Sequence, residues 1–260
     1  MSDLIKEFYE LAKDTNFNVL GLLTSDYKIL TLGSDSKLIG RIFELISKQL
    51  LQKICVIHGW TLEETESQTT YPDFTISKKE GNKIAVDIKT TYRRYNKYGV
   101  SKFGFTLGSF ASFLRNNTKN IAYPYNQYDE HYVIGFVYDR VEDAIPGDMK
   151  KLTDKILPPY NNVEFFIQEK YKIAGEKPGS GNTENIGSFL STQVSDFVEG
   201  NGPFSKLGNV VFENYWKHYP KYREIDKIYT SLEEYFKYYG IDYERDEKGN
   251  FILKDRPPLS

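Results

Sequence analysis

Residues 71–91 read YPDFTISKKEGNKIAVDIKTT, and this stretch decides the fold that we expect. Two runs with β-branched alternation, 71–77 and 83–91, flank the five residues Lys78–Asn82, a pattern typical of a β-hairpin. A loop of this length places Asp73 directly opposite Asp87 on the neighbouring strand. The stretch therefore predicts a hairpin that carries two facing carboxylates.

The side chain of Lys89 shares a strand face with Asp87, because alternate residues of a strand project to the same side. Residues 84, 86 and 88 are apolar and take the other face. Opposed like charges destabilise a sheet, whereas Mg²⁺ is commonly held by one or two carboxylates, waters and a substrate phosphate. Lys89 would then orient and help deprotonate an attacking water and stabilise charge on the phosphorus. The pattern predicts Mg²⁺-dependent phosphodiester hydrolysis; an exposed hairpin with a cross-strand ion pair is the alternative.

The rest of the chain alternates helical and strand patterns, so we expect one α/β domain with a mixed central sheet flanked by helices. The expected helices cover 3–13, 37–58 (with Ser36 as N-cap and Gly59 as terminator), 109–117 and 210–239. The expected strands cover 18–22, 28–32, 131–141 and 163–174, with a Gly/Ser/Asn-rich loop at 175–187 and a turn at 246–250. Within residues 1–260 we expect a single domain with an N-terminal part (about 1–35), a core (about 36–205) and a helical C-terminal part (about 206–260).

Composition narrows the function classes. A net charge of −2 and a pI of about 6.0 argue against a protein that coats nucleic acid through bulk positive charge. A local basic run remains at 89–102, without one acidic residue, although a solvated basic loop explains it equally well. The three histidines lack zinc-ligand spacing, and no phosphate-binding GxxxxGK[ST] motif occurs.

Cysteine and hydropathy patterns bear on location. Cys55 is the only cysteine, so no disulfide can form within the chain, and its apolar helical surroundings predict that it packs in the core. No apolar run reaches the length of a membrane span. We expect a cytoplasmic protein with no membrane partner.

Several blocks of the sequence resemble the EcoRV-type type II restriction endonucleases. They occur in the same order and with almost the same spacing as in that family, cover about residues 3–204 and fade afterwards: GSDSK (33–37), IFELIS (42–47), YPDFT (71–75), IAVDIKTTY (84–92), FTLGSF (105–110), SFLRNNTKNIAYP (112–124) and IAGEKPGSGNTENIGS (173–188). The resemblance implies a restriction-endonuclease-like PD-(D/E)xK fold in a homodimer around double-stranded DNA. Residues of about 1–35 would then be the dimerisation part and about 36–205 the catalytic and DNA-binding core. It also implies Mg²⁺-dependent cleavage that leaves a 5′-phosphate, at GATATC with a blunt cut at the central TA step. A cognate DNA methyltransferase is the implied functional partner, without a stable complex.

By matching position, the resemblance gives roles to the residues of the hairpin. Asp73 and Asp87 become metal ligands, Lys89 the catalytic lysine, and the main-chain carbonyl of Ile88 completes a metal site. Glu44 matches an accessory acidic residue of the family, catalytic and metal-binding. On the sequence pattern alone, Glu44 belongs to a polar helix stripe and a solvated role is favoured.

The resemblance also identifies residues that would contact DNA. The Gly-rich segment 178–185 matches a loop that enters the major groove, where glycine permits close approach and an Asn amide can pair with adenine; a flexible surface loop is the alternative. Its expected contacts are Gly179, Ser180, Gly181, Asn182, Thr183 and Asn185. Minor-groove contacts are expected from Gln68 and Thr69, in a loop that departs from the family. Further contacts are expected from Lys37, Thr91, Tyr92, Thr106, Ser112 and Lys119. Arg115 and Asn117 lie in the same block, 112–124, as Ser112 and Lys119. Helix capping and surface charge are the alternative roles for the residues of this block.

Three other functions stay open. The first is a less specific PD-(D/E)xK repair nuclease, which a smear rather than discrete DNA fragments would favour. The second is a sequence-specific DNA-binding dimer that does not cleave, which Mg²⁺-independent retention of DNA without product would favour. The third is an α/β domain whose hairpin has no catalytic role.

Overall fold

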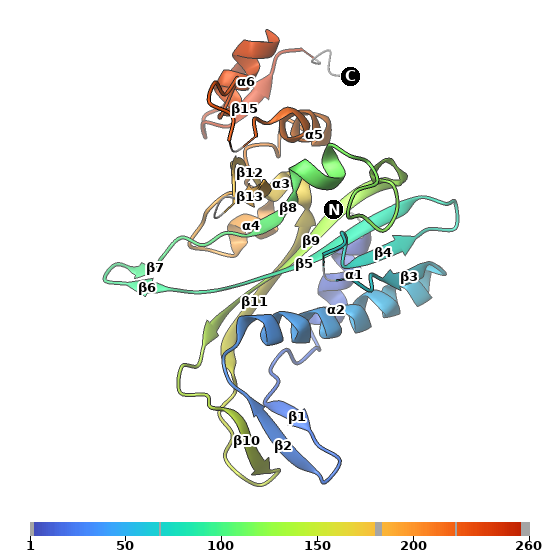
Figure 1. Cartoon of the computed structure of the whole chain (residues 1–260), viewed down its shortest axis with the longest axis vertical. Coiled ribbons are helices and arrows are strands. Elements are labelled where there is room, and N and C mark those ends of the chain that lie inside the picture. Colours follow the sequence, from blue (N-terminus) through green and yellow to red (C-terminus); the bar gives the residue numbers. More distant parts are fainter. Residues whose placement is uncertain (1–2, 68, 180–183, 222, 256–260) are drawn as a thin grey trace.

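The computed structural model of the chain describes residues 3–67, 69–179, 184–221 and 223–255. Its centre is a five-stranded sheet in the order β11-β9-β5-β4-β3 (Figure 1). Only the β5–β9 pair is parallel within this sheet, and the other neighbours are antiparallel. The expected mixed α/β architecture is therefore confirmed. The strands are β3 (Thr61–Glu64), β4 (Phe74–Ser77), β5 (Lys83–Tyr92), β9 (Tyr128–Arg140) and β11 (Tyr160–Glu169).

The hairpin formed by β4 and β5 has the predicted register. Phe74 pairs with Val86 and Ser77 pairs with Lys83. The loop between the strands is closed by a 2.8 Å hydrogen bond from the Lys78 N–H to the Asn82 carbonyl. Continued by one residue beyond β4, this register sets Asp73 opposite Asp87.

Two helices, α1 (Asp3–Ala12) and α2 (Ser36–His58), cover one face of the sheet, where residues 84, 86 and 88 of β5 are buried against them. Helix α2 is capped by Asp35, whose carboxylate accepts 3.0 Å hydrogen bonds from the N–H groups of residues 37 and 38. The expected Ser36 cap is wrong, because Ser36 already lies in the first helical turn. Gly59, in the left-handed conformation, ends the helix as predicted, and Cys55 is buried as predicted.

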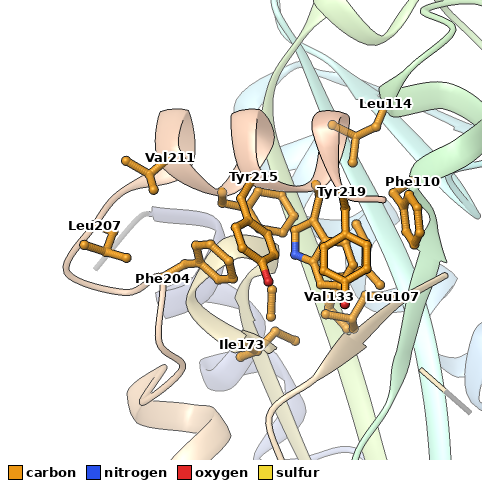
Figure 2. Packing of buried hydrophobic residues seen from close by; sticks show 14 of the residues in the cluster. Leu107, Phe110, Leu114, Val133, Ile173, Phe204, Leu207, Val211, Tyr215 and Tyr219 are labelled. Atoms are coloured by element: carbon orange, nitrogen blue, oxygen red, sulfur yellow. The ribbon is translucent and has the colours of Figure 1, made fainter. Parts of the chain in front are cut away.

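The other face of the sheet is covered by the C-terminal half of the chain. This half contains α3 (Lys170–Ile173), α4 (Ser195–Glu199), α5 (Asn209–His218) and α6 (Leu232–Tyr239). It also supplies β12 (Ala174–Pro178) and β13 (Asn185–Ser188) of a small sheet whose third strand, β8 (Thr106–Ser109), comes from the first half of the chain. Figure 2 shows Tyr215 and Tyr219 packed near Val133 of β9 and Leu107 of β8. The C-terminal part thus shares one hydrophobic core with the central sheet.

The single helix expected over 210–239 is wrong, because the chain breaks between α5 and α6. Pro220 has no N–H to continue the helix and disfavours helical geometry in the residue before it. Tyr219 accordingly adopts φ −56° and ψ 134°. After α6, a hairpin of β14 (Tyr243–Arg245) and β15 (Phe251–Leu253) encloses the predicted turn at 246–250.

Three further segments differ from expectation. The strand expected over 163–174 ends at Glu169 and passes into α3, and the loop expected over 175–187 contains β12 and β13. A Cβ on Gly187 would lie 2.8 Å from the Lys177 carbonyl oxygen, so glycine here permits close strand packing rather than a loop. The helix expected over 109–117 is reduced to a short helical segment, Phe110–Leu114.

Two smaller hairpins project from the central sheet (Figure 1). The strands β1 (Gly21–Leu23) and β2 (Lys28–Leu32), near the predicted positions, form a sheet with β10 (Pro146–Lys151). The strands β6 (Tyr95–Asn96) and β7 (Gly99–Val100) pair within the basic run. None of the helices in the described ranges is both long and apolar enough to span a membrane.

Candidate active site

The two carboxylates of the hairpin and Lys89 line one pocket on the side of the sheet that faces β8 and β13. Asp73 lies one residue before β4, and its Oδ2 accepts a 2.6 Å hydrogen bond from the Ile88 N–H of β5. Asp87 lies within β5 and is 4% exposed. Pairing of β5 with strands on both sides fixes the backbone that carries Asp87 and Lys89.

The electrostatics of the pocket are dominated by the opposed carboxylates. Burial raises the pKa of Asp73, and the nearby charge of Asp87 raises it further, while Lys89 opposes the increase. The Lys89 Nζ lies 2.7 Å from Asp87 Oδ2. Burial lowers the pKa of Lys89, but the two carboxylates outweigh burial and its pKa is raised overall. Lys89 is therefore held as an ammonium ion.

The donor set fits a hard divalent cation. Asp87 Oδ2 is buried and, although close to the Lys89 ammonium, receives no hydrogen bond of good geometry from the described residues. Two neighbouring carboxylates are the ligands that Mg²⁺ takes when water and substrate complete its shell. Among the described residues, no three Asp, Glu, His or Cys side chains gather closely enough to form a metal site on their own. The pair Asp73 and Asp87 is thus an incomplete site that suits a cation shared with substrate.

Glu44 lies on α2 beside an adjoining hollow, which Asp73 and Lys89 also line. Its carboxylate forms a 2.8 Å ion pair with Arg41, and Arg41 forms a second 2.8 Å ion pair with Glu64. Glu44 adds negative potential at both Asp73 and Lys89. Glu44 therefore lies near the carboxylate pair, but its ion-pair partner is Arg41 of the same helix.

The comparisons with known proteins agree with this geometry. The family model described as "Restriction endonuclease EcoRV" matches residues 13–240. The chain belongs to the EcoRV restriction endonuclease family. A type II restriction enzyme EcoRV from Escherichia coli is 43% identical over 241 residues, which are 90% of this chain and 95% of that enzyme. Our expectation that the resemblance fades after residue 204 is wrong, since the family match continues to 240.

One solved structure is also similar in outline. The NlaIV restriction endonuclease gives a TM-score of 0.38 at 12% identity, with 91% of this chain and 88% of that chain covered. A similarity of this size carries no argument, and the family assignment rests on the sequence matches.

In this EcoRV-type endonuclease, some residues expected to contact DNA gather at the pocket. Thr69, Ser112 and Asn185 line it together with the carboxylates. Ser112 is buried and its hydroxyl donates a 2.8 Å hydrogen bond to the Lys119 carbonyl, so it orders the backbone that carries Lys119. The Lys119 side chain is exposed.

The other expected DNA contacts lie on neighbouring elements or outside the described residues. Lys37, on the first turn of α2, lines the adjoining hollow with Glu44. Thr91 and Tyr92 end β5, and Thr106 of β8 lies beside Gly179, where an added Cβ would be 3.2 Å from its hydroxyl. Gln68, Ser180, Gly181, Asn182 and Thr183 lie outside the described residues.

Two basic side chains, those of Arg115 and Arg93, bind groups of the protein itself. The Arg115 guanidinium donates to the carbonyl of Lys217 at 2.9 Å and to the carbonyl of Tyr219, so it ties the end of α5 to the core instead of facing a phosphate. Arg93, in the basic run, forms ion pairs with Asp139 and Glu164. The basic run therefore offers less free charge than its sequence suggests.

Several pocket residues were missed in the sequence. Tyr71, Gly108, Ser109, Phe113 and Asn120 also line the pocket. Their positions depend on the pairing of β8 with β13 and on the bridge between Tyr71 and residue 121. No local pattern indicates these contacts, because the partners are far apart in the chain.

Proposed function

We propose that this chain is a homodimeric type II site-specific deoxyribonuclease that hydrolyses both strands of double-stranded DNA with Mg²⁺. The observation that carries the proposal is the cross-strand pair of Asp73 and Asp87 with Lys89 2.7 Å from Asp87. Buried like charges beside a fixed ammonium are costly unless a cation and an anionic substrate join them. Membership of the EcoRV family makes DNA that substrate.

The mechanism follows from the charges of the site. Asp73 and Asp87 would hold Mg²⁺, with the Ile88 carbonyl and Glu44 as further candidates. Bound there, Mg²⁺ supplies a Lewis acid for the phosphate and a lowered pKa for water. Because the pKa of Lys89 is raised, its ammonium orients the attacking water and stabilises charge growing on the phosphate oxygens. Lys89 is thus an electrostatic catalyst first, and any proton transfer from water to Lys89 would require prior loss of its own proton.

We propose that the recognised site is GATATC, cut bluntly at the central TA step to leave a 5′-phosphate. The block 173–188, which includes the proposed major-groove loop, supports this specificity through its resemblance to the family. Pyrimidine–purine steps such as TA unstack easily, so bending of the DNA would add to the discrimination. The changed loop around Thr69 makes flanking preference the feature expected to differ.

The dimer interface that we propose includes the β1–β2–β10 sheet, which extends the N-terminal dimerisation part. Leu22 and Met149 both pair with Leu30, so they share one face of this sheet, and each is 49% exposed. Apolar side chains gathered on one small exposed sheet mark a protein contact, and in a homodimer the same patch meets itself. Leu22→Asp should shift the protein toward monomer in sedimentation, whereas Val56→Asp, at the far end of α2, should leave it dimeric.

Two wider consequences belong to the same proposal. Cleavage of a short palindrome would damage the host's own DNA unless that site were protected, so a cognate DNA methyltransferase is the expected functional partner. Action on cellular DNA agrees with the predicted cytoplasmic location. Both stay predictions.

The decisive experiment is digestion of a sequenced plasmid by the purified protein, with Mg²⁺ or with EDTA, followed by mapping of the product ends. Blunt ends within GATATC, found only with Mg²⁺, are expected. Discrete ends at another sequence would keep the mechanism and refute the specificity. A smear would favour a less specific nuclease, and retention of DNA without product would favour a binding protein.

A further inference from the structure

The β6–β7 hairpin, with the residues that flank it, forms a projecting arm (residues 93–102) that carries unpaired positive charge. The arm contains four basic residues and no acidic one. Arg93, at its base, is neutralised by two carboxylates. The other three, Arg94, Lys97 and Lys102, are exposed, and none of them forms an ion pair with a described residue. The arm therefore presents three free cations on a chain whose net charge is −2.

Hydrogen bonds give the arm a defined shape. Its two strands leave a two-residue tip between them. The Asn96 side chain accepts a 2.8 Å hydrogen bond from the Tyr98 N–H and donates one of 2.9 Å to the Ser101 hydroxyl. At the base, the Tyr95 hydroxyl donates a 2.9 Å hydrogen bond to Asp139 of β9. The tip is thus held out from the sheet by bonds within the arm and by an anchor on β9.

Packing does not explain the side chains at the tip. Tyr98 is 86% exposed, and the Lys97 Nζ lies 4.8 Å from the centre of its ring. Apart from its two tyrosine rings, the exposed side chains of the arm are polar or basic, so the arm offers little apolar surface for a protein partner. Lysine, arginine and tyrosine side chains are groups that donate hydrogen bonds to DNA phosphates. The tip has the chemistry of a contact with the DNA backbone.

The arm continues the strand that carries the catalytic residues (Figure 1). Arg94 donates a 3.0 Å hydrogen bond to the hydroxyl of Tyr92, the last residue of β5 and one of the expected DNA contacts. The eight residues from Lys89 to Lys97 span up to about 26 Å at about 3.3 Å per residue. DNA rises about 3.4 Å per base pair, so half of a six-base-pair site extends only about 10 Å from its centre. The arm can therefore reach phosphates beyond the site.

We propose that the β6–β7 hairpin is a DNA-backbone arm that binds phosphates flanking the recognised site. The inference rests on the proposed function, because it takes the scissile phosphate to lie beside Asp73, Asp87 and Lys89. Phosphates are the same in every sequence, so the arm adds affinity and orients the duplex without adding base specificity. It also concentrates the positive charge that a protein of net charge −2 needs in order to hold a polyanion.

The test compares the arm variant Lys97→Gln/Lys102→Gln with the control Lys6→Gln/Lys53→Gln, which removes two exposed lysines from α1 and α2. Two fluorescein-labelled duplexes, of about 30 and about 10 base pairs, each carry a central GATATC; only the longer one extends past the reach of the arm. Binding of each duplex to the full-length protein is measured by fluorescence anisotropy in EDTA over a series of KCl concentrations.

The arm variant should bind the long duplex at least about tenfold more weakly than the parent at about 0.1 M KCl. Its slope of log Kd against log[KCl] should fall by about 3–4, because a dimer loses four lysines and each phosphate contact contributes about 0.9. The loss on the short duplex should be much smaller. The control and the charge-conserving Lys97→Arg/Lys102→Arg should match the parent. If the arm variant does not fold, Arg94→Gln provides the same comparison.

Each other outcome overturns a stated part of the proposal. An unchanged Kd and salt slope in the arm variant would show a merely solvated hairpin. Equal losses on the two duplexes would place the lysines within the site and refute the flanking position. A shift toward monomer in sedimentation, with DNA binding unchanged, would make the arm a subunit contact.

The same measurements separate this inference from the proposed function. A parent that binds DNA but does not cleave it with Mg²⁺ refutes the proposed function, and the anisotropy series still decides whether the arm binds DNA. A parent that cleaves DNA, with an arm variant that binds as the parent does, refutes this inference alone. A parent that binds neither duplex and cleaves no DNA refutes both.

Discussion

Neutralising Asp73 should stabilise the metal-free protein while abolishing DNA cleavage. Asp73→Asn keeps the shape of the side chain and an oxygen that can accept the 2.6 Å hydrogen bond from the Ile88 N–H. It removes the negative charge whose presence is disfavoured by burial and by Asp87. The substitution therefore isolates the cost of the like-charge pair from the packing of the hairpin.

The size of the effect follows from the cross-strand geometry. Carboxylates on directly opposed residues, about 5 Å apart, repel by about 3 kcal/mol at an effective dielectric constant of about 20. The attraction of the Lys89 ammonium for Asp73, which the variant also loses, offsets roughly half of this. We expect Asp73→Asn to gain about 1–2 kcal/mol in EDTA, or about 3–6 °C in Tm for a chain of this size.

Mg²⁺ should reverse the order of stability. At a hundredfold excess over its Kd, a ligand that binds only the folded state stabilises it by about 2.7 kcal/mol. The parent should gain this increment in thermal unfolding with MgCl₂, and Asp73→Asn, lacking one ligand, should gain almost none. Glu66→Gln, an exposed carboxylate on the adjoining hollow, is the matched control and should behave as the parent does. A variant less stable than the parent in EDTA, or one that keeps the Mg²⁺ increment, would refute the reasoning.

Three other predictions concern the site and its support. In EDTA, parent stability should fall as pH rises from about 4, because folded protein keeps a proton on Asp73 that the unfolded chain has lost; a urea series should show no such fall in Asp73→Asn. Lys89→Met should lower the cleavage rate by about 100-fold or more while the Mg²⁺-dependent gain in Tm persists, and a near-normal rate would exclude its electrostatic role. Arg115→Met should cost about 1–3 kcal/mol in urea unfolding by leaving two carbonyls at the end of α5 unpaired, and unchanged stability would show that water replaces the guanidinium.

The part of the fold that could be predicted is the part set by local rules. The hairpin register followed from a short loop and strict alternation, and the structure pairs Phe74 with Val86 as expected. The same periodicity gave α1, α2 and the buried Cys55. These features depend on neighbours a few residues apart, so one sequence suffices to find them.

The features that could not be predicted depend on contacts between distant segments. Glycine at 187 indicates a loop by its backbone freedom, yet here it admits a closely packed strand whose neighbours come from β8 and β12. Arg115 carries a charge suited to phosphate, yet it bonds carbonyls about a hundred residues away. A sequence shows which interactions such residues can make, but it does not show which residue of the fold will be their partner.

β5 lies between two hydrophobic cores, so Asp87 is shielded from water by residues on both sides of the sheet. In such surroundings each charge of the site depends on the others, because solvent cannot screen them. A cation and a DNA phosphate would complete this cluster. The opposed carboxylates that destabilise the protein without metal are therefore the same groups that would bind the metal for hydrolysis.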